Sequence, residues 1–142
     1  MSEALFPAPV LVVSDDDGFD RARSLPRSPE SAAVARRLVR RALATWSLPD
    51  LVEGAVLVVT ELVANAAVHA RGATIQVTVA RVAIGQVRVA VIDLDRTEPA
   101  LRLAADDDER GRGLALVEAV SARWGVDPLR WGKRVWADLE AA

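Results

Sequence analysis

Two runs of alternating apolar residues near the middle of the chain place the strongest limit on its fold. In each run, every second residue is branched and apolar. These positions are Ile75, Val77 and Val79 in the first run, and Val87, Val89 and Val91 in the second. Residues two apart share one face of a β-strand, so each run predicts a strand that buries one face. The segment 83–86 contains a glycine, which predicts an antiparallel hairpin whose second strand ends at Asp93.

Two helices are expected before this hairpin. Ser28 and Pro29 offer an N-cap and a proline at the first helical position, which predicts a helix that runs to about Trp46. Apolar residues at helical spacing predict a second helix over about 49–70, and Gly72 follows it as a stop. The first helix carries an arginine cluster mainly on its polar face, at Arg36, Arg37, Arg40 and Arg41. The cluster indicates a solvated face, with contact to a partner as the alternative.

The sequence after the hairpin predicts a long loop, a helix and two short strands. The loop spans about 95–110 and contains an acidic run, and the helix is expected from Gly111 to about Arg123. Short strands are expected near 125–127 and 133–139.

Nearer the N-terminus, a short strand is expected at 22–25, and residues 1–20 are interpreted as a flexible tail or an added edge strand. The order of helix, helix, hairpin, loop, helix and hairpin predicts an α+β fold. We expect a two-layer sandwich in which helices pack on one face of a mostly antiparallel sheet, with the domain spanning residues 21–142.

Composition limits the classes of function. A chain of 142 residues fits one domain, and its net charge of -2 gives no reason to expect direct binding to nucleic acid or a membrane. The chain has no cysteine and one histidine, which excludes disulfides and thiolate metal sites and makes a protein-built zinc site unexpected. The N-terminal segment does not resemble a signal peptide, and no stretch is expected to reach transmembrane length. We therefore expect a cytoplasmic protein.

Three polar residues near the end of the second predicted helix form a candidate site. Glu61, Asn65 and His69 are spaced four apart, so a carboxylate, an amide and an imidazole share one helix face. Alanines fill the positions between them and would let another group approach closely. The same spacing also occurs on helices that have no site, so the pattern needs support from the rest of the chain.

That support comes from a resemblance to a known superfamily. The segment Glu61-x-x-x-Asn65-Ala66-x-x-His69 resembles the first nucleotide-binding box of the Bergerat-fold ATPases, which include gyrase, sensor histidine kinases and anti-sigma-factor serine kinases. Segment 89–93 resembles the strand that ends in the adenine-reading aspartate, and 111–114 resembles the glycine-containing lid box. Segment 132–139 resembles the closing strand of the anti-sigma kinase branch. The resemblance runs from about residue 24 to residue 139.

The resemblance implies a role for each matching residue. Asn65 would bind Mg²⁺ through its amide oxygen, and Glu61 would take the proton from an attacking hydroxyl or water. Asp93 would accept a hydrogen bond from the adenine amino group. The remaining nucleotide-binding positions would be Ala66, Gly111, Arg112, Gly113 and Leu114, and the ligands would be ATP and Mg²⁺. His69 is expected to pack or to bond to a loop.

The same resemblance implies partners and leaves two functional classes open. The first is an anti-sigma-type serine/threonine kinase that binds a sigma factor and phosphorylates a serine on an antagonist domain, with a homodimer as a further option. The second is a module that binds nucleotide weakly or not at all and regulates by protein contact alone. Three residues depart from the superfamily pattern at the adenine end, namely Asp95, Lys133 and Arg134. Asp95 and Arg134 favour the second class, whereas the retention of Glu61 and Asn65 favours the first.

Overall fold

A five-stranded antiparallel sheet forms one layer of the structure, which is a computed structural model that describes residues 20–70, 72–93, 107–130 and 132–141. Its strand order is β1-β2-β3-β5-β4. The strands are β1 (Asp20–Pro26), β2 (Thr74–Ala83), β3 (Gln86–Asp93), β4 (Arg123–Leu129) and β5 (Gly132–Glu140). Because β5 lies between β3 and β4, the second half of the chain returns to pair with the central hairpin.

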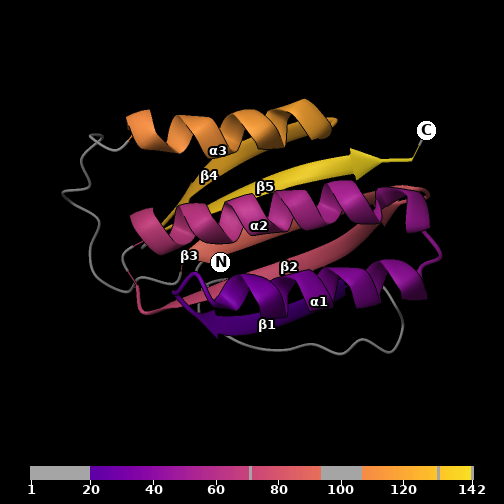
Figure 1. The fold of residues 1–142 in the computed structure, drawn as a ribbon, viewed down its shortest axis with the longest axis horizontal. Coiled ribbons are helices and arrows are strands. Elements are labelled where there is room, and N and C mark those ends of the chain that lie inside the picture. The colour runs from indigo at the N-terminus through magenta and orange to yellow at the C-terminus, as the bar shows by residue number, and fades with distance from the viewer. Residues whose placement is uncertain (1–19, 71, 94–106, 131, 142) are drawn as a thin grey trace.

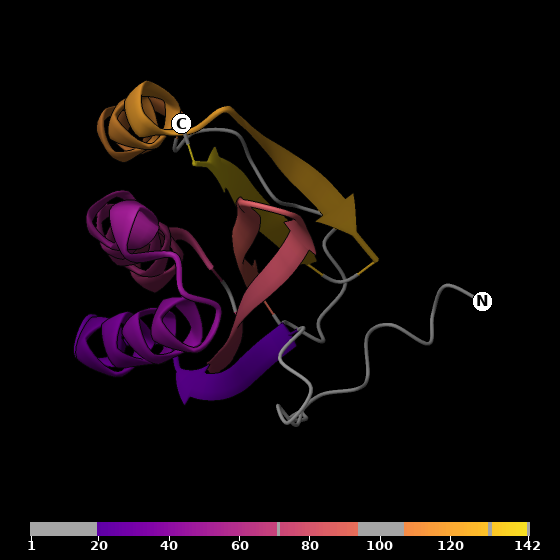
Figure 2. The same ribbon diagram turned by 90° about the vertical axis from the view of Figure 1, so that its right-hand side faces the viewer.

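The second layer consists of three helices, α1 (Ser31–Thr45), α2 (Val52–His69) and α3 (Asp107–Val120). A short 3-10 turn, η2 (Pro49–Leu51), leads into α2. Figure 1 shows α2 between the other two helices, and Figure 2 shows all three helices on the same side of the sheet. The expected α+β sandwich, with helices on one face of an antiparallel sheet, is confirmed.

The central hairpin forms as its alternation predicts. Val77 pairs with Val91 and Val79 with Val89, so the apolar positions of both strands lie on one face and are buried under the helices. Gly85 occupies the turn with φ of 70°, a left-handed conformation that glycine adopts without steric cost. The register also pairs Ile75 with Asp93, which places Asp93 at the end of β3 next to the beginning of β2.

The hydrophobic core lies between α2 and the sheet. The core positions of α2 recur at helical spacing, and those of the strands recur at every second residue. The largest fully buried side chains include Leu43 on α1, Leu62 on α2 and Ile75 on β2. The core thus fixes α2, with its polar residues, against β3.

Several boundaries differ from the sequence-based expectations. The first helix begins at Ser31 rather than Pro29, because residues 28–31 form a turn in which the Ser31 amide donates to the Ser28 carbonyl at 3.0 Å. Oγ of Ser31 then donates to the Pro26 carbonyl at 2.7 Å and ties the helix to the end of β1. The first strand is longer than 22–25, and residues 1–19 and 94–106 lie outside the described part of the chain.

The third helix differs from expectation at both ends. It begins at Asp107 rather than Gly111 and ends at Val120, so residues 107–110 are helical and not part of the expected loop. Acidic residues are favoured in the first turn of a helix, where the N–H groups carry partial positive charge, which suits a start within the acidic run. The following strand starts at Arg123, where the helix was expected to continue.

The second helix also corrects the expectation about transmembrane length. Segment Pro49–His69 has 21 residues and a mean hydropathy of 1.8, so it is long and apolar enough to cross a membrane by those two criteria. In the fold it is the middle helix of the layer, and its buried residues pack on the sheet and on α1. Core packing therefore accounts for the apolar residues on the buried face of the helix.

Candidate functional site

The carboxylate of Glu61 lies against the backbone of α3. A Cβ atom added to Gly113 would be 3.0 Å from Glu61 Oε1, a contact tighter than an ordinary one. The absence of a side chain at Gly113 therefore lets the two helices approach closely at this point. Two predicted site residues that are distant in the sequence are thus brought together.

Asn65 lies one turn after Glu61 on the same face of α2. It is only 9% exposed, yet within the described residues its side-chain amide has no hydrogen-bond partner. Its amide atoms are not among the fully buried, unpaired side-chain atoms of the described residues, so the amide keeps some contact with solvent. Its oxygen is the kind of ligand that Mg²⁺ accepts, so Asn65 fits the expected contact with that ion.

Asp93 is the buried acidic group at the end of β3. It is 4% exposed, and the Gly72 amide donates a hydrogen bond to its Oδ1 at 3.2 Å. Gly132, at the start of β5, also approaches it, because a Cβ atom added to Gly132 would lie 2.4 Å from the Asp93 carbonyl oxygen. Only glycine fits there. The carboxylate of Asp93 is an acceptor with two oxygens, which suits recognition of an amino group.

These residues lie at one end of the domain. The exit of β3 is joined to the segment between α2 and β2 by the bond from Gly72 to Asp93, and to the start of β5 by the close approach of Gly132. Figure 1 shows that the C-terminal end of α2 and the N-terminal end of α3 lie at the same end. Two sets of contacts are therefore observed in this part of the fold: Glu61 with Gly113, and Asp93 with Gly72 and Gly132.

The expected lid box lies inside α3 and not at its first residue. Because the helix begins at Asp107, the amides without an intrahelical acceptor belong to residues 107–110, and Gly111, Arg112 and Gly113 follow them. The expected helix start at Gly111 was wrong, whereas the assignment of phosphate contacts to 111–114 stays a prediction. Leu114 is half-buried and packs on the hydrophobic core, which anchors this part of α3.

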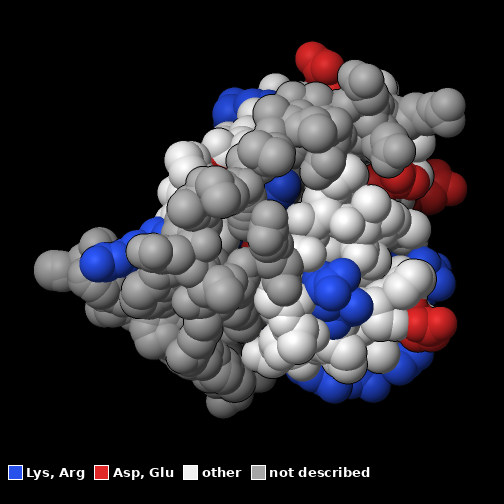
Figure 3. Space-filling model, turned by 90° about the vertical axis from the view of Figure 1, so that its left-hand side faces the viewer, with Lys and Arg blue, Asp and Glu red and all other residues white. Residues whose placement is uncertain are grey.

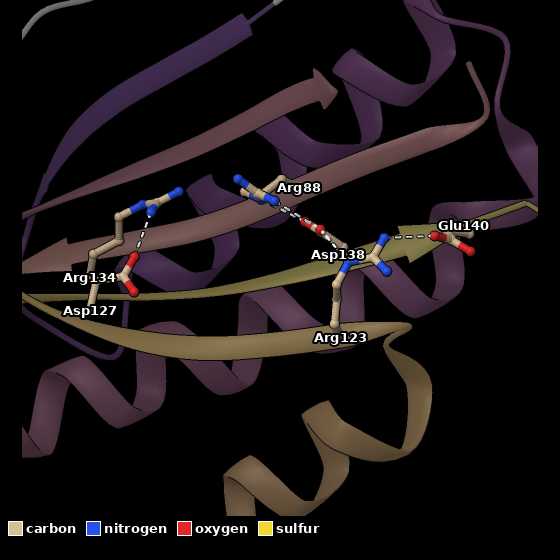
Figure 4. Close-up of polar contacts among 6 residues, drawn as sticks. All are labelled: Arg88, Arg123, Asp127, Arg134, Asp138 and Glu140. Carbon is tan, nitrogen blue, oxygen red and sulfur yellow. Dashed lines mark hydrogen bonds and ion pairs between the residues drawn. The ribbon is translucent and has the colours of Figure 1, made fainter. Parts of the chain in front are cut away.

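Arg134 does not occupy the site. It pairs with Ile92, so it lies on the face of the sheet opposite to Asp93. There its NH1 donates to Asp127 Oδ2 at 2.8 Å (Figure 4). Lys133 is the next residue along β5 and belongs to the face that carries Val135, which is the side of the helices. Of the three departures from the superfamily pattern, Arg134 is thus turned away, and Asp95 lies outside the described residues.

A second polar cluster on the sheet face away from the helices has a structural role. Asp138 is fully buried and receives hydrogen bonds from Arg88 at 2.6 and 2.9 Å and from Arg123 at 3.2 Å (Figure 4). Burial alone would raise the pKa of Asp138, but the bonds and charge of the two arginines outweigh it and lower that pKa. Arg88 also stacks on Trp136, with its Cζ 4.6 Å from the ring centroid. The cluster joins β3, β5 and β4.

Basic side chains gather along α1. Figure 3 views the end of the domain that carries Asp93 and shows lysine and arginine side chains along its lower edge, where α1 lies. Arg37, Arg40 and Arg41 are exposed, while NH1 of Arg36 donates to Thr60 Oγ1 at 3.3 Å. This arrangement agrees with the solvated face expected from the sequence.

Protein side chains alone do not offer a metal site in the described ranges. No group of three or more histidine, aspartate or glutamate residues is placed there to hold an ion. A Mg²⁺ ion at Asn65 would therefore take most of its oxygen ligands from phosphate and water, as this ion commonly does.

Sequence reasoning did not single out two residues that shape the site. Gly72 was interpreted only as a helix stop, although its amide bonds to Asp93. Arg27 was given no role, although its guanidinium bonds to the carbonyls of Ala67 and Gly72. These contacts join segments that lie far apart in the chain, so neither spacing nor periodicity indicates them.

Comparison with known proteins gives one match of wide extent. A family model described as the histidine kinase-like ATPase domain matches residues 25–137, which is most of the chain. No curated protein matches this chain. The matched range includes α2, the hairpin, α3 and most of β5, and therefore every predicted site residue.

Proposed function

Because the chain belongs to the histidine kinase-like ATPase domain family, we propose that it is an ATP-binding regulatory protein whose site lies between α2, α3 and the end of β3. The observation that carries the proposal is the placement of Asn65 one turn after Glu61 on α2, where the Glu61 carboxylate lies against Gly113 of α3. Asp93 supplies the buried acceptor expected for an adenine amino group.

We further propose that the regulatory activity is that of an anti-sigma-type serine/threonine kinase. Glu61 would accept the proton of a serine hydroxyl on an antagonist domain while that oxygen bonds to the γ-phosphorus and the bond to ADP breaks. Asn65 would hold Mg²⁺, whose charge favours transfer of the phosphoryl group. The partly exposed Glu61 carboxylate, without an ion-pair partner in the described ranges, supports this role.

The alternative is a module that regulates by protein contact alone. Lys133 favours it, because a lysine stands where the superfamily pattern has a threonine that helps the aspartate hold adenine. Arg134, in contrast, gives it no support, since its side chain bonds to Asp127 on the other face of the sheet. Nucleotide binding is therefore the property that separates the two proposals.

Calorimetric titration with ATP and Mg²⁺ tests the first step. We expect saturable binding by the wild-type protein, and we expect Asn65→Ala to abolish the Mg²⁺-dependent part while the melting temperature stays close to wild type. Equal affinity in the two proteins would contradict the metal role of Asn65. No binding by the wild type would favour the protein-contact module.

Phosphotransfer to candidate antagonist domains tests the second step. Glu61→Gln keeps the size of the side chain but removes the proton acceptor, so we expect ATP binding without transfer of the phosphoryl group. Transfer by Glu61→Gln at the wild-type rate would exclude Glu61 as the base. If the wild type binds ATP but modifies none of the domains, the kinase proposal fails and ATP binding stands.

A further inference from the structure

Arg27, the residue after β1, links three parts of the backbone near Asp93. Its Nε donates to the Gly72 carbonyl at 2.7 Å, and its NH1 donates to the Ala67 carbonyl at 2.9 Å. Its own amide donates to the Ala73 carbonyl at 2.9 Å and continues the pairing of β1 with β2. One half-buried side chain thus holds both the last turn of α2 and the segment that follows it.

The end of a helix is a favourable place for such a cation. The last carbonyls of α2 have no amide partner within the helix, and the helix dipole gives this end partial negative charge. The guanidinium of Arg27 satisfies the carbonyl of Ala67 and extends to Gly72 with its rigid fork of donors. It therefore fixes the direction in which the chain leaves the helix.

Gly72 is hydrogen-bonded to both Arg27 and Asp93. Its carbonyl accepts from Arg27, while its amide donates to Asp93 Oδ1 at 3.2 Å. Glycine has no side chain to limit its φ and ψ, so its orientation depends on the contacts made by its own backbone. The three residues form one continuous chain of hydrogen bonds from a guanidinium to a carboxylate.

We infer that Arg27 is a positioning residue for base recognition, which orients the Asp93 carboxylate through Gly72 and so sets the preference for adenine over guanine. The inference rests on the proposed binding of ATP. Adenine presents an amino group where guanine presents a carbonyl, so a well-oriented carboxylate accepts a bond from the first and repels the second. A carboxylate that is free to rotate loses part of this discrimination.

The test compares affinities for ATP and GTP in matched arginine variants. We expect Arg27→Ala to reduce the ratio of ATP affinity to GTP affinity by roughly fivefold to tenfold, in keeping with the loss of one positioning hydrogen bond. We expect Arg27→Lys to fall between Arg27→Ala and wild type, because an ammonium lacks the fork that reaches both carbonyls. The control is Arg37→Ala on α1, which removes an equal charge from an exposed position and should leave the ratio unchanged.

A double-mutant cycle separates positioning from general stability. In the Asp93→Asn background, Arg27→Ala should produce no further change in the ATP to GTP ratio, because the group that it orients has been altered. A ratio that stays at the wild-type value in Arg27→Ala would overturn the inference. An equal change with and without Asp93→Asn would overturn it as well, even if Arg27→Ala lowers the melting temperature.

Hydrogen exchange tests the same chain of bonds without nucleotide. Arg27→Ala should increase the exchange rate of the Gly72 amide at least severalfold, and Arg37→Ala should not. If the wild-type protein binds no nucleotide, the proposed function and the inferred role in base recognition both fail, and the exchange result then shows whether Arg27 orders Gly72. If the wild type binds ATP and Gly72 exchanges equally in all three proteins, the positioning role alone fails.

Discussion

Gly132→Ala should destabilise the sheet at the end where Asp93 lies. The added Cβ would be 2.4 Å from the Asp93 carbonyl oxygen, about 1 Å closer than the 3.4 Å at which ordinary contact begins. The obstructing atom belongs to the backbone and cannot rotate away, so β5 must move relative to β3 next to the pair Ile92 and Arg134. Strain of this kind typically costs about 1–3 kcal/mol.

Thermal unfolding measures this cost. For a chain of this size, 1 kcal/mol shifts the melting temperature by roughly 3 °C, so Gly132→Ala should melt roughly 3–9 °C below wild type. The matched control is Gly54→Ala in α2, where the added Cβ meets only the end of the Leu139 side chain, at 3.0 Å. Alanine is also favoured over glycine within a helix by roughly 0.5–1 kcal/mol, which offsets this contact.

The two variants must differ for the reasoning to hold. We expect Gly54→Ala to stay within about 1 kcal/mol of wild type. We also expect Gly132→Ala to bind ATP more weakly than Gly54→Ala does, because the movement of β5 shifts Asp93. A melting temperature for Gly132→Ala equal to that of wild type, or an equal loss in both variants, would refute the close approach of Gly132 to Asp93.

Two further predictions concern two acidic residues, Asp138 on β5 and Glu61 on α2. Asp138→Asn should destabilise the protein by roughly 1–3 kcal/mol in urea unfolding, because Arg88 and Arg123 lose their shared carboxylate. Since the pKa of Asp138 is lowered in the folded state, its contribution is present above the ordinary aspartate pKa of about 3.9 and is lost as the pH falls through the folded value. Wild type should therefore lose its advantage over Asp138→Asn in acid, and a constant difference at every pH would contradict this. Gly113→Ala would place a Cβ 3.0 Å from the Glu61 carboxylate, so we expect slower phosphoryl transfer or ATP hydrolysis at saturating ATP, and an unchanged rate would refute that contact.

The layer structure follows directly from patterns in the sequence. Alternation at Val77 and Val79 predicted a strand with one buried face, and the register with Val91 and Val89 confirms it. Helical spacing likewise predicted α2, because its buried positions recur every three or four residues. These patterns are informative because the residues that face the core must be apolar, and they recur at the repeat of the helix or strand that carries them.

Element ends were harder to predict. The third helix begins four residues before Gly111, since an acidic run can serve either as a loop or as the first turn of a helix. The first helix begins after Ser28 rather than at Pro29, because local backbone bonds complete a turn there first. A sequence does not show which of these local arrangements the tertiary contacts favour.

The candidate site likewise combines relations that the sequence predicts with contacts that it does not. Glu61 and Asn65 could be predicted to share a face, because a helix fixes their relation. The approach of Gly113 to Glu61 and of Gly132 to Asp93 depends on how helices and strands pack, and the role of Arg27 depends on a contact across the sheet edge. The resemblance to a superfamily assigned Glu61, Asp93 and Gly113 to one site, but it predicted none of these three contacts.

Backbone amide NMR during a titration with ATP and Mg²⁺ tests the shared site most directly. The account predicts that the signals of Gly72, Gly113 and the Asn65 side-chain amide shift together with one dissociation constant. Gly85, at the turn of the β2–β3 hairpin, should stay unchanged. Independent titration of Gly72 and Gly113, or shifts that leave both of them and Asn65 unaffected, would contradict the claim that these segments together bind one nucleotide.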